Sequence, residues 1–243
     1  MFKENGYKMK IVNSRTKNSH RERIMSSIFL AKRRRFLTHL LLAFFTVAGC
    51  YIAFLLKSDA RLVRQLTLGF GYVSLILLMF TLLIGPWKVL RQHRNPVSIN
   101  LRRDVGIWAG ISGVLHVLFG FQVHMKGQVL LYFLKPDGEV YKPLLNLFGM
   151  SNYIGAIATL ILLLLLALSN DLSLRWLKRR RWKFLQRFNY LSFILVLAHT
   201  LSYQVIAKRE YSIVVIVLGL TSVVFVMQSL GFFLYGRMVG DVK

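Results

Sequence analysis

The sequence has few of the residues that soluble catalytic and metal-binding sites use most. It contains a single cysteine, Cys50, which excludes an intrachain disulfide and a cluster of thiolate ligands. Its 243 residues include only 9 Asp and Glu against 33 Lys and Arg. No phosphate-binding loop, dinucleotide glycine motif or HExxH zinc motif occurs in it. These absences argue against nucleotide-dependent and zinc-dependent enzymes.

Six long stretches lack Asp, Glu, Lys and Arg altogether. They cover residues 36–56, 67–85, 105–125, 147–168, 188–207 and 211–236. A helix needs about 20 apolar residues to cross the hydrocarbon core, and a spanning backbone must satisfy its own hydrogen bonds. We therefore predict an all-α protein, a polytopic membrane bundle of six transmembrane helices over residues 36–236. A basic, disordered cytoplasmic tail over 1–35 is expected before it, and a short cytoplasmic tail over 237–243 after it.

The positive charge is distributed unevenly between the two sides of the predicted membrane domain. Lys and Arg number 11 in residues 1–35, 5 in 86–104, 7 in 169–187 and 2 after residue 236. The alternating segments 57–66, 126–146 and 208–210 hold only 3, 3 and 2. Since cytoplasmic segments are enriched in Lys and Arg, both termini are predicted to be cytoplasmic. Topology and anionic lipid thus explain the net charge of +24, and no nucleic-acid partner is expected.

The first apolar stretch also permits another interpretation. Arg33, Arg34 and Arg35 precede it like a twin-arginine signal, and the residues up to Cys50 resemble a lipoprotein cleavage site. We favour an ordinary first helix, because more membrane helices follow instead of an exported domain. Processing at Cys50 stays an alternative.

Two histidines stand out because they lie deep inside predicted spans, where ionisable residues are functional candidates. No acid lies inside any of the six stretches, so histidine is the remaining candidate for chemistry. His116 and His199 each come 11 residues after the start of a stretch that enters from the cytoplasm. At 1.5 Å per residue, both imidazoles should lie at about 16 Å depth, near the bilayer centre. Imidazole is a good iron ligand, so a b-type haem between the third and fifth predicted helices is the favoured interpretation.

A simpler alternative is that each histidine only hydrogen-bonds to a neighbouring helix. The small residues near the first histidine fit either interpretation, because they would admit a flat macrocycle or tight helix packing. They are Gly110, Ser112, Gly113 and Gly120.

The segments around these histidines resemble a known family. Leu101–Trp108, followed by Leu115 and His116, is similar to the "RRxLGLW…LH" stretch of the ferric-reductase-like transmembrane family. Arg181–Leu191 is similar to its "RWxxLHxxxYL" motif, and Ala198-His199 to its "xHY" end. The likeness covers roughly residues 67–235 and is closest to the MsrQ-type branch, the haem-binding membrane subunits of a methionine-sulfoxide reductase system.

The resemblance implies a membrane cytochrome b with His116 and His199 as ligands of the haem iron. Arg102, Arg103 and Arg187 are further candidates for cofactor binding, to haem propionates or quinone, although they also suit lipid headgroups. Where the family has a second histidine, 13 residues before His199, this chain has Gln186. The resemblance therefore implies one haem b rather than two.

Such a chain would be an electron-transfer subunit of an oxidoreductase system rather than a complete enzyme. Its soluble segments are short, so no FAD or NAD site is expected in it. The donor would be a quinol or a separate flavoprotein, and the acceptor a separate molecule on the outer side. The expected location is a bacterial plasma (inner) membrane or a thylakoid-like membrane.

Two other functions stay open. A non-catalytic membrane scaffold or assembly protein would keep the fold without the full set of haems for electron transfer, and Gln186 favours this function. A small-solute transporter is the second, but the spans lack buried charge and paired broken helices.

Overall fold

The computed structural model describes residues 2–56, 61–91, 99–125, 127–206 and 211–240. Residue 207 of the fifth predicted span and residues 241–243 of the predicted C-terminal tail lie outside these ranges. The chain divides into two compact units, residues 1–41 and 42–243, which are described separately.

The first unit contains most of α1 (Phe2–Leu56), so the predicted disordered tail is helical in the structure. No proline interrupts this helix, and its 11 Lys and Arg residues are good helix formers. Residues 42–56 of α1 belong to the second unit.

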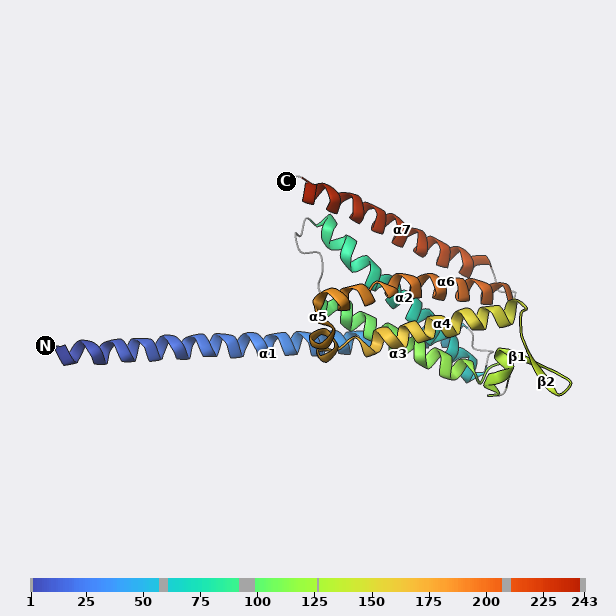
Figure 1. Cartoon of the computed structure of the whole chain (residues 1–243), viewed down its shortest axis with the longest axis horizontal. Helices are drawn as coiled ribbons and strands as arrows, with labels where there is room; N and C mark the ends of the chain where they lie inside the picture. Colours follow the sequence, from blue (N-terminus) through green and yellow to red (C-terminus); the bar gives the residue numbers. More distant parts are fainter. Residues whose placement is uncertain (1, 57–60, 92–98, 126, 207–210, 241–243) are drawn as a thin grey trace. The chain divides into compact units, whose positions relative to one another are not determined.

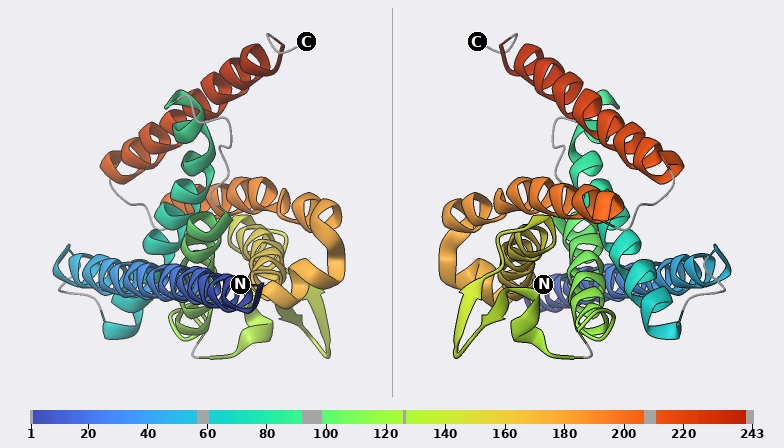
Figure 2. Two further views of the ribbon diagram at one scale, coloured as in Figure 1. Left: turned by 90° about the vertical axis from the view of Figure 1, so that its left-hand side faces the viewer. Right: turned by 90° about the vertical axis from the view of Figure 1, so that its right-hand side faces the viewer.

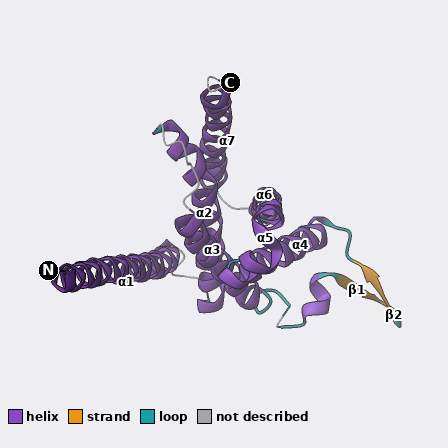
Figure 3. Cartoon of the chain, turned by 60° about the vertical axis from the view of Figure 1, so that its left-hand side comes forward, coloured by secondary structure: helices purple, strands orange, loops and turns teal. Residues whose placement is uncertain are grey.

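The second unit consists mainly of helices (Figure 1). They are α2 (Leu62–Leu90), α3 (Ile99–Gly120), α4 (Leu147–Ala167), α5 (Asp171–Leu185), α6 (Phe188–Ile206) and α7 (Tyr211–Gly240). The predicted segment 126–146 contains a 3₁₀ turn, η1 (Val129–Tyr132), and a hairpin of β1 (Leu134–Asp137) and β2 (Val140–Pro143) (Figure 3). We call this the hairpin end of the unit, and the end that carries α5 the basic end.

Five described helical segments are long and apolar enough to cross a membrane. They are Lys32–Leu56, Leu62–Leu90, Leu147–Ala167, Arg180–Ile206 and Ile213–Met238. The chain is therefore a mostly helical integral membrane protein. The predicted third span is also helical, but as α3 it begins at Ile99 and ends at Gly120 instead of covering 105–125. Its crossing of the membrane stays a prediction.

The short apolar part of α3 has a structural explanation. Charged residues occupy its first two turns, and the chain turns away after Gly120, where the Tyr132 hydroxyl accepts hydrogen bonds from the backbone N–H groups of His124 and Met125. The helix packs against both α2 and α4. Neighbouring helices therefore shield part of α3 from lipid.

The helix α2 is at the centre of the unit and contacts α3, α6 and α7 (Figure 2). Pro86 lies inside α2 and has no N–H, which leaves the carbonyl of Leu82 without its regular helical donor. Gln228 of α7 supplies a replacement, since its Nε2 donates to the Leu82 oxygen at 2.6 Å. Gly231, three residues further along α7, lies directly over Pro86. The proline thus fixes where α7 packs.

Candidate functional site

The structure brings together the two histidines that the sequence places at equal depth. His116 comes from α3 and His199 from α6, and their ring centres are 6.0 Å apart with the ring planes at 84°. Both side chains are partly buried and lie near the hairpin end of the second unit.

Each imidazole has one nitrogen engaged by a backbone carbonyl. The Nδ1 atom of His116 is 2.8 Å from the oxygen of Thr67 in α2. The Nδ1 atom of His199 is 2.9 Å from the oxygen of Ser151 in α4. Because a carbonyl oxygen only accepts hydrogen bonds, Nδ1 carries the proton in both rings, and Nε2 keeps its lone pair. Histidines that ligate a metal through Nε2 are commonly oriented in this way.

A glycine makes room for each ring. A Cβ added to Gly71 would lie 2.7 Å from Nδ1 of His116, and one added to Gly155 would lie 2.7 Å from Nδ1 of His199. Each glycine follows the carbonyl-bearing residue by four positions, one turn further along the same helix. We call these two arrangements the glycine seats, Thr67–Gly71 and Ser151–Gly155.

The sequence analysis missed the glycine seats, although a signal was present. Both are a hydroxyl residue followed by glycine four positions later, within an apolar stretch. The small residues of α3 itself serve another purpose. Gly113 lies against Leu162 of α4 and Ser74 of α2. These small residues bring helices close, which agrees with the packing interpretation.

A polar network borders the histidines on the side of the hairpin end. The ring of Tyr203 is 4.8 Å from that of His199, one turn away in α6. Its hydroxyl donates to Oδ1 of Asn152 at 2.6 Å, and Asn152 Nδ2 donates to the backbone carbonyl oxygen of Tyr132 at 3.1 Å. Because Asn152 follows Ser151, the same turn of α4 holds both His199 and Tyr203.

The predicted arginines lie at the opposite end of the unit. Arg102 and Arg103 come 14 and 13 residues before His116 in the continuous helix α3, which corresponds to about 20 Å along its axis. Both line a small cavity together with Gln186, whereas Arg187 is exposed. The structure therefore does not bring these three arginines to the histidines.

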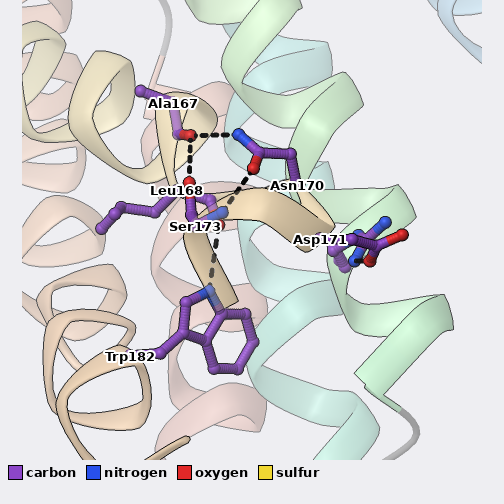
Figure 4. A network of polar contacts seen from close by, with 7 residues as sticks. Ala167, Leu168, Asn170, Asp171, Ser173 and Trp182 are labelled. Atoms are coloured by element: carbon purple, nitrogen blue, oxygen red, sulfur yellow. Dashed lines mark hydrogen bonds and ion pairs between the residues drawn. The ribbon is translucent and has the colours of Figure 1, made fainter. Parts of the chain in front are cut away.

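The chain is fixed tightly around the start of α5 at this basic end (Figure 4). Asn170 caps α5 by accepting from the Ser173 N–H at 2.7 Å. Trp182 Nε1 donates to the oxygen of Leu168 at 3.0 Å, and Arg103 donates to Asp171 at 2.5 Å. These contacts hold the beginnings of α3 and α5 at the same end.

The sequence analysis found no acid in a span, but the structure shows a buried one close by. Asp104 comes one residue before the predicted third span, lies within α3 and is 2% exposed. The helix begins before the last charge, so a charge-free stretch does not mark its start.

The two histidines fit a metal that brings other ligands of its own. Within the described ranges, no group of three His, Cys, Asp or Glu could hold a bare metal ion. A haem iron already has four porphyrin nitrogens and needs only two axial ligands. Metal–imidazole bonds are about 2 Å long, so two imidazoles on one ion have ring centres roughly 6 Å apart. The observed separation, the tautomers with the proton on Nδ1 and the glycine seats all agree with this arrangement.

Comparison with known proteins gives one family. Residues 70–197, which include His116 and end two residues before His199, match the ferric reductase like transmembrane component family. No curated protein matches the chain.

Proposed function

Because the chain belongs to the ferric reductase like transmembrane component family, which indicates electron transfer in a membrane, we propose that it holds one haem b between His116 and His199. The observation that carries this proposal is the pair of glycine seats, each of which orients an imidazole through Nδ1. When bound, the haem would supply one-electron redox chemistry at its iron.

The protein's own residues would set the conditions for that chemistry. The carbonyls of Thr67 and Ser151 fix the tautomer and rotation of the two rings, and they raise the basicity of Nε2. Partial burial between α2, α3, α4 and α6 would limit the access of water. The Tyr203–Asn152 hydrogen bond braces the side of His199 that faces the hairpin end.

The finer assignments belong to the same proposal. The chain would cross the membrane six times, with α3 as the third crossing, and the distribution of Lys and Arg supports cytoplasmic termini and a hairpin end on the outer side. The chain would belong to the MsrQ-type branch. Electrons would come from a quinol or a separate flavoprotein and leave to an acceptor on the outer side. The membrane would be a bacterial plasma membrane or a thylakoid-like one. Gln186 stands where the family has a histidine, which supports one haem rather than two.

Gln186 also favours a second candidate function. A membrane scaffold or assembly protein would keep the fold without a complete path for electrons, and a missing inner ligand is expected in such a protein. The two candidates differ in whether haem binds at all.

A difference spectrum tests the proposal. We expect the detergent-purified protein, expressed with ample haem, to show a b-type reduced-minus-oxidised spectrum. His116→Ala and His199→Ala should each lose it, whereas His124→Ala, a control at the hairpin end, should keep it. A wild type without a Soret band would exclude the cytochrome and leave the scaffold.

A further inference from the structure

A small cavity opens between α2, α3, α4 and α6 at the basic end. Leu78, Leu162 and Leu165 form its apolar part, and Arg102, Arg103 and Gln186 supply the polar part. It is separate from the histidines, because Arg102 and Gln186 come 14 and 13 residues before His116 and His199. Its charged end, at Arg102 and Arg103, lies about 20 Å along α3 from His116.

Two hydrogen-bond donors in this cavity have no acceptor among the described residues. They are Nε of Arg103 and Nε2 of Gln186, and both atoms are buried. The Arg103 side chain is only 7% exposed, and its ion pair with Asp171 holds the guanidinium in place. A buried donor without a partner is costly, so native proteins rarely keep one unless something else supplies an acceptor.

Two further polar groups of the lining do not accept from these donors in the structure. Asn189 Nδ2 donates to Oγ1 of Thr81 at 2.8 Å, and the Ser169 hydroxyl donates to the oxygen of Leu165 at 2.7 Å. The cavity thus presents two donors without an acceptor beside a leucine surface. A complementary ligand has acceptor oxygens on an apolar ring and reaches the site from the membrane.

We propose that this cavity binds the head group of a membrane quinone, with a carbonyl oxygen accepting from Arg103 Nε and Gln186 Nε2. The leucines would contact the ring. The enclosed space has room for about two water molecules, so the partly exposed Arg102 side chain must turn outward as the head group enters. This proposal gives the binding site of the electron donor, and in that respect it rests on the proposed function. Quinone binding can be measured whether or not haem is bound.

The test is calorimetric titration of the protein, reconstituted in lipid nanodiscs, with decyl-ubiquinone. Gln186→Leu removes one donor and should weaken binding about tenfold. Gly106→Leu should abolish binding by filling the cavity, which Gly106 lines. Gln122→Leu changes an exposed glutamine at the hairpin end and should bind like the wild type. Circular dichroism melts identify any variant that fails to fold.

Several outcomes overturn the proposal. One is a wild type that does not bind the quinone, and another is a folded Gln186→Leu or Gly106→Leu that binds it as tightly as the wild type. Inorganic phosphate that binds alone and displaces the quinone would assign an oxyanion site instead.

The haem and quinone proposals fail separately. The double variant His116→Ala/His199→Ala should lose haem and keep quinone binding. A wild type that binds quinone in a Gln186-dependent manner but shows no Soret band contradicts only the proposed function. A b-type spectrum without quinone binding contradicts only the present inference.

Discussion

The carbonyl oxygens of Thr67 and Ser151 have equivalent positions in two different helix pairs. Each accepts a hydrogen bond from a histidine of the neighbouring helix, and each lies four residues before a glycine. The pair α2–α3 and the pair α4–α6 thus present an imidazole in the same way. Two rings fixed independently by rigid helices form a preorganised site, which metal binding requires.

Gly71→Ala and Gly155→Ala should each lower haem occupancy at least severalfold. The new Cβ would overlap Nδ1, so the imidazole must leave its carbonyl and change its orientation. The Soret absorbance per protein measures the effect. Gly219→Ala in α7 is the matched control, because nothing lies within 4 Å of its Cβ position. Full occupancy in both seat variants would contradict the role of the glycines.

Gln228→Leu should destabilise the protein by about 1 kcal/mol, because the Leu82 carbonyl loses its donor in an apolar surrounding. Denaturant titration in detergent measures the free energy of unfolding. Pro86→Ala restores an N–H at the position that normally donates to Leu82. In that background Gln228→Leu should cost clearly less, and an equal cost in both backgrounds would show that the bond does not compensate for the proline.

Asn152→Leu should cost about 2 kcal/mol, since Asn152 is buried and bonds to both Tyr203 and Tyr132. Tyr203→Phe removes only the hydroxyl and should cost about half as much. In a double-mutant cycle, the double variant should lose less stability than the sum of the losses in the two single variants. The exposed Asn100→Ala is the control, and strict additivity would show that the two side chains act independently.

Site-directed labelling tests whether α3 crosses the membrane. In a Cys50→Ala background, Tyr141→Cys in β2 should react with an impermeant thiol reagent from one side only. Asn100→Cys in α3 and Arg175→Cys in α5 should react from the other side, because the Arg103–Asp171 ion pair holds the beginnings of α3 and α5 at one end. Labelling of positions 100 and 141 from the same side would mean that α3 does not span.

The sequence allowed much of the helical layout to be predicted, because charge-free stretches follow the cost of burying charge in lipid. The stretch 147–168 is α4 (Leu147–Ala167) in the structure. The rule failed for α3, whose first turns include Arg103 and Asp104 in the protein interior, where partners replace water. The basic helix α5 was missed because a polar amphipathic segment leaves no apolar run.

The candidate site was only half visible in the sequence. Equal depth suggested that His116 and His199 meet, since depth follows from counting residues along two helices. The glycine seats depend on which neighbouring helix each histidine faces, and a single sequence does not show which helices are neighbours. The same limitation hid the cavity, which needs the side chains of four helices.

The bond between Gln228 and Leu82 joins residues that are 146 positions apart, and this has a consequence for biogenesis. The ribosome delivers α2 to the membrane long before α7 has been made. Until then the kink at Pro86 presents a carbonyl that hydrocarbon cannot solvate. A chain interrupted before residue 228 would keep the Leu82 carbonyl without this side-chain donor.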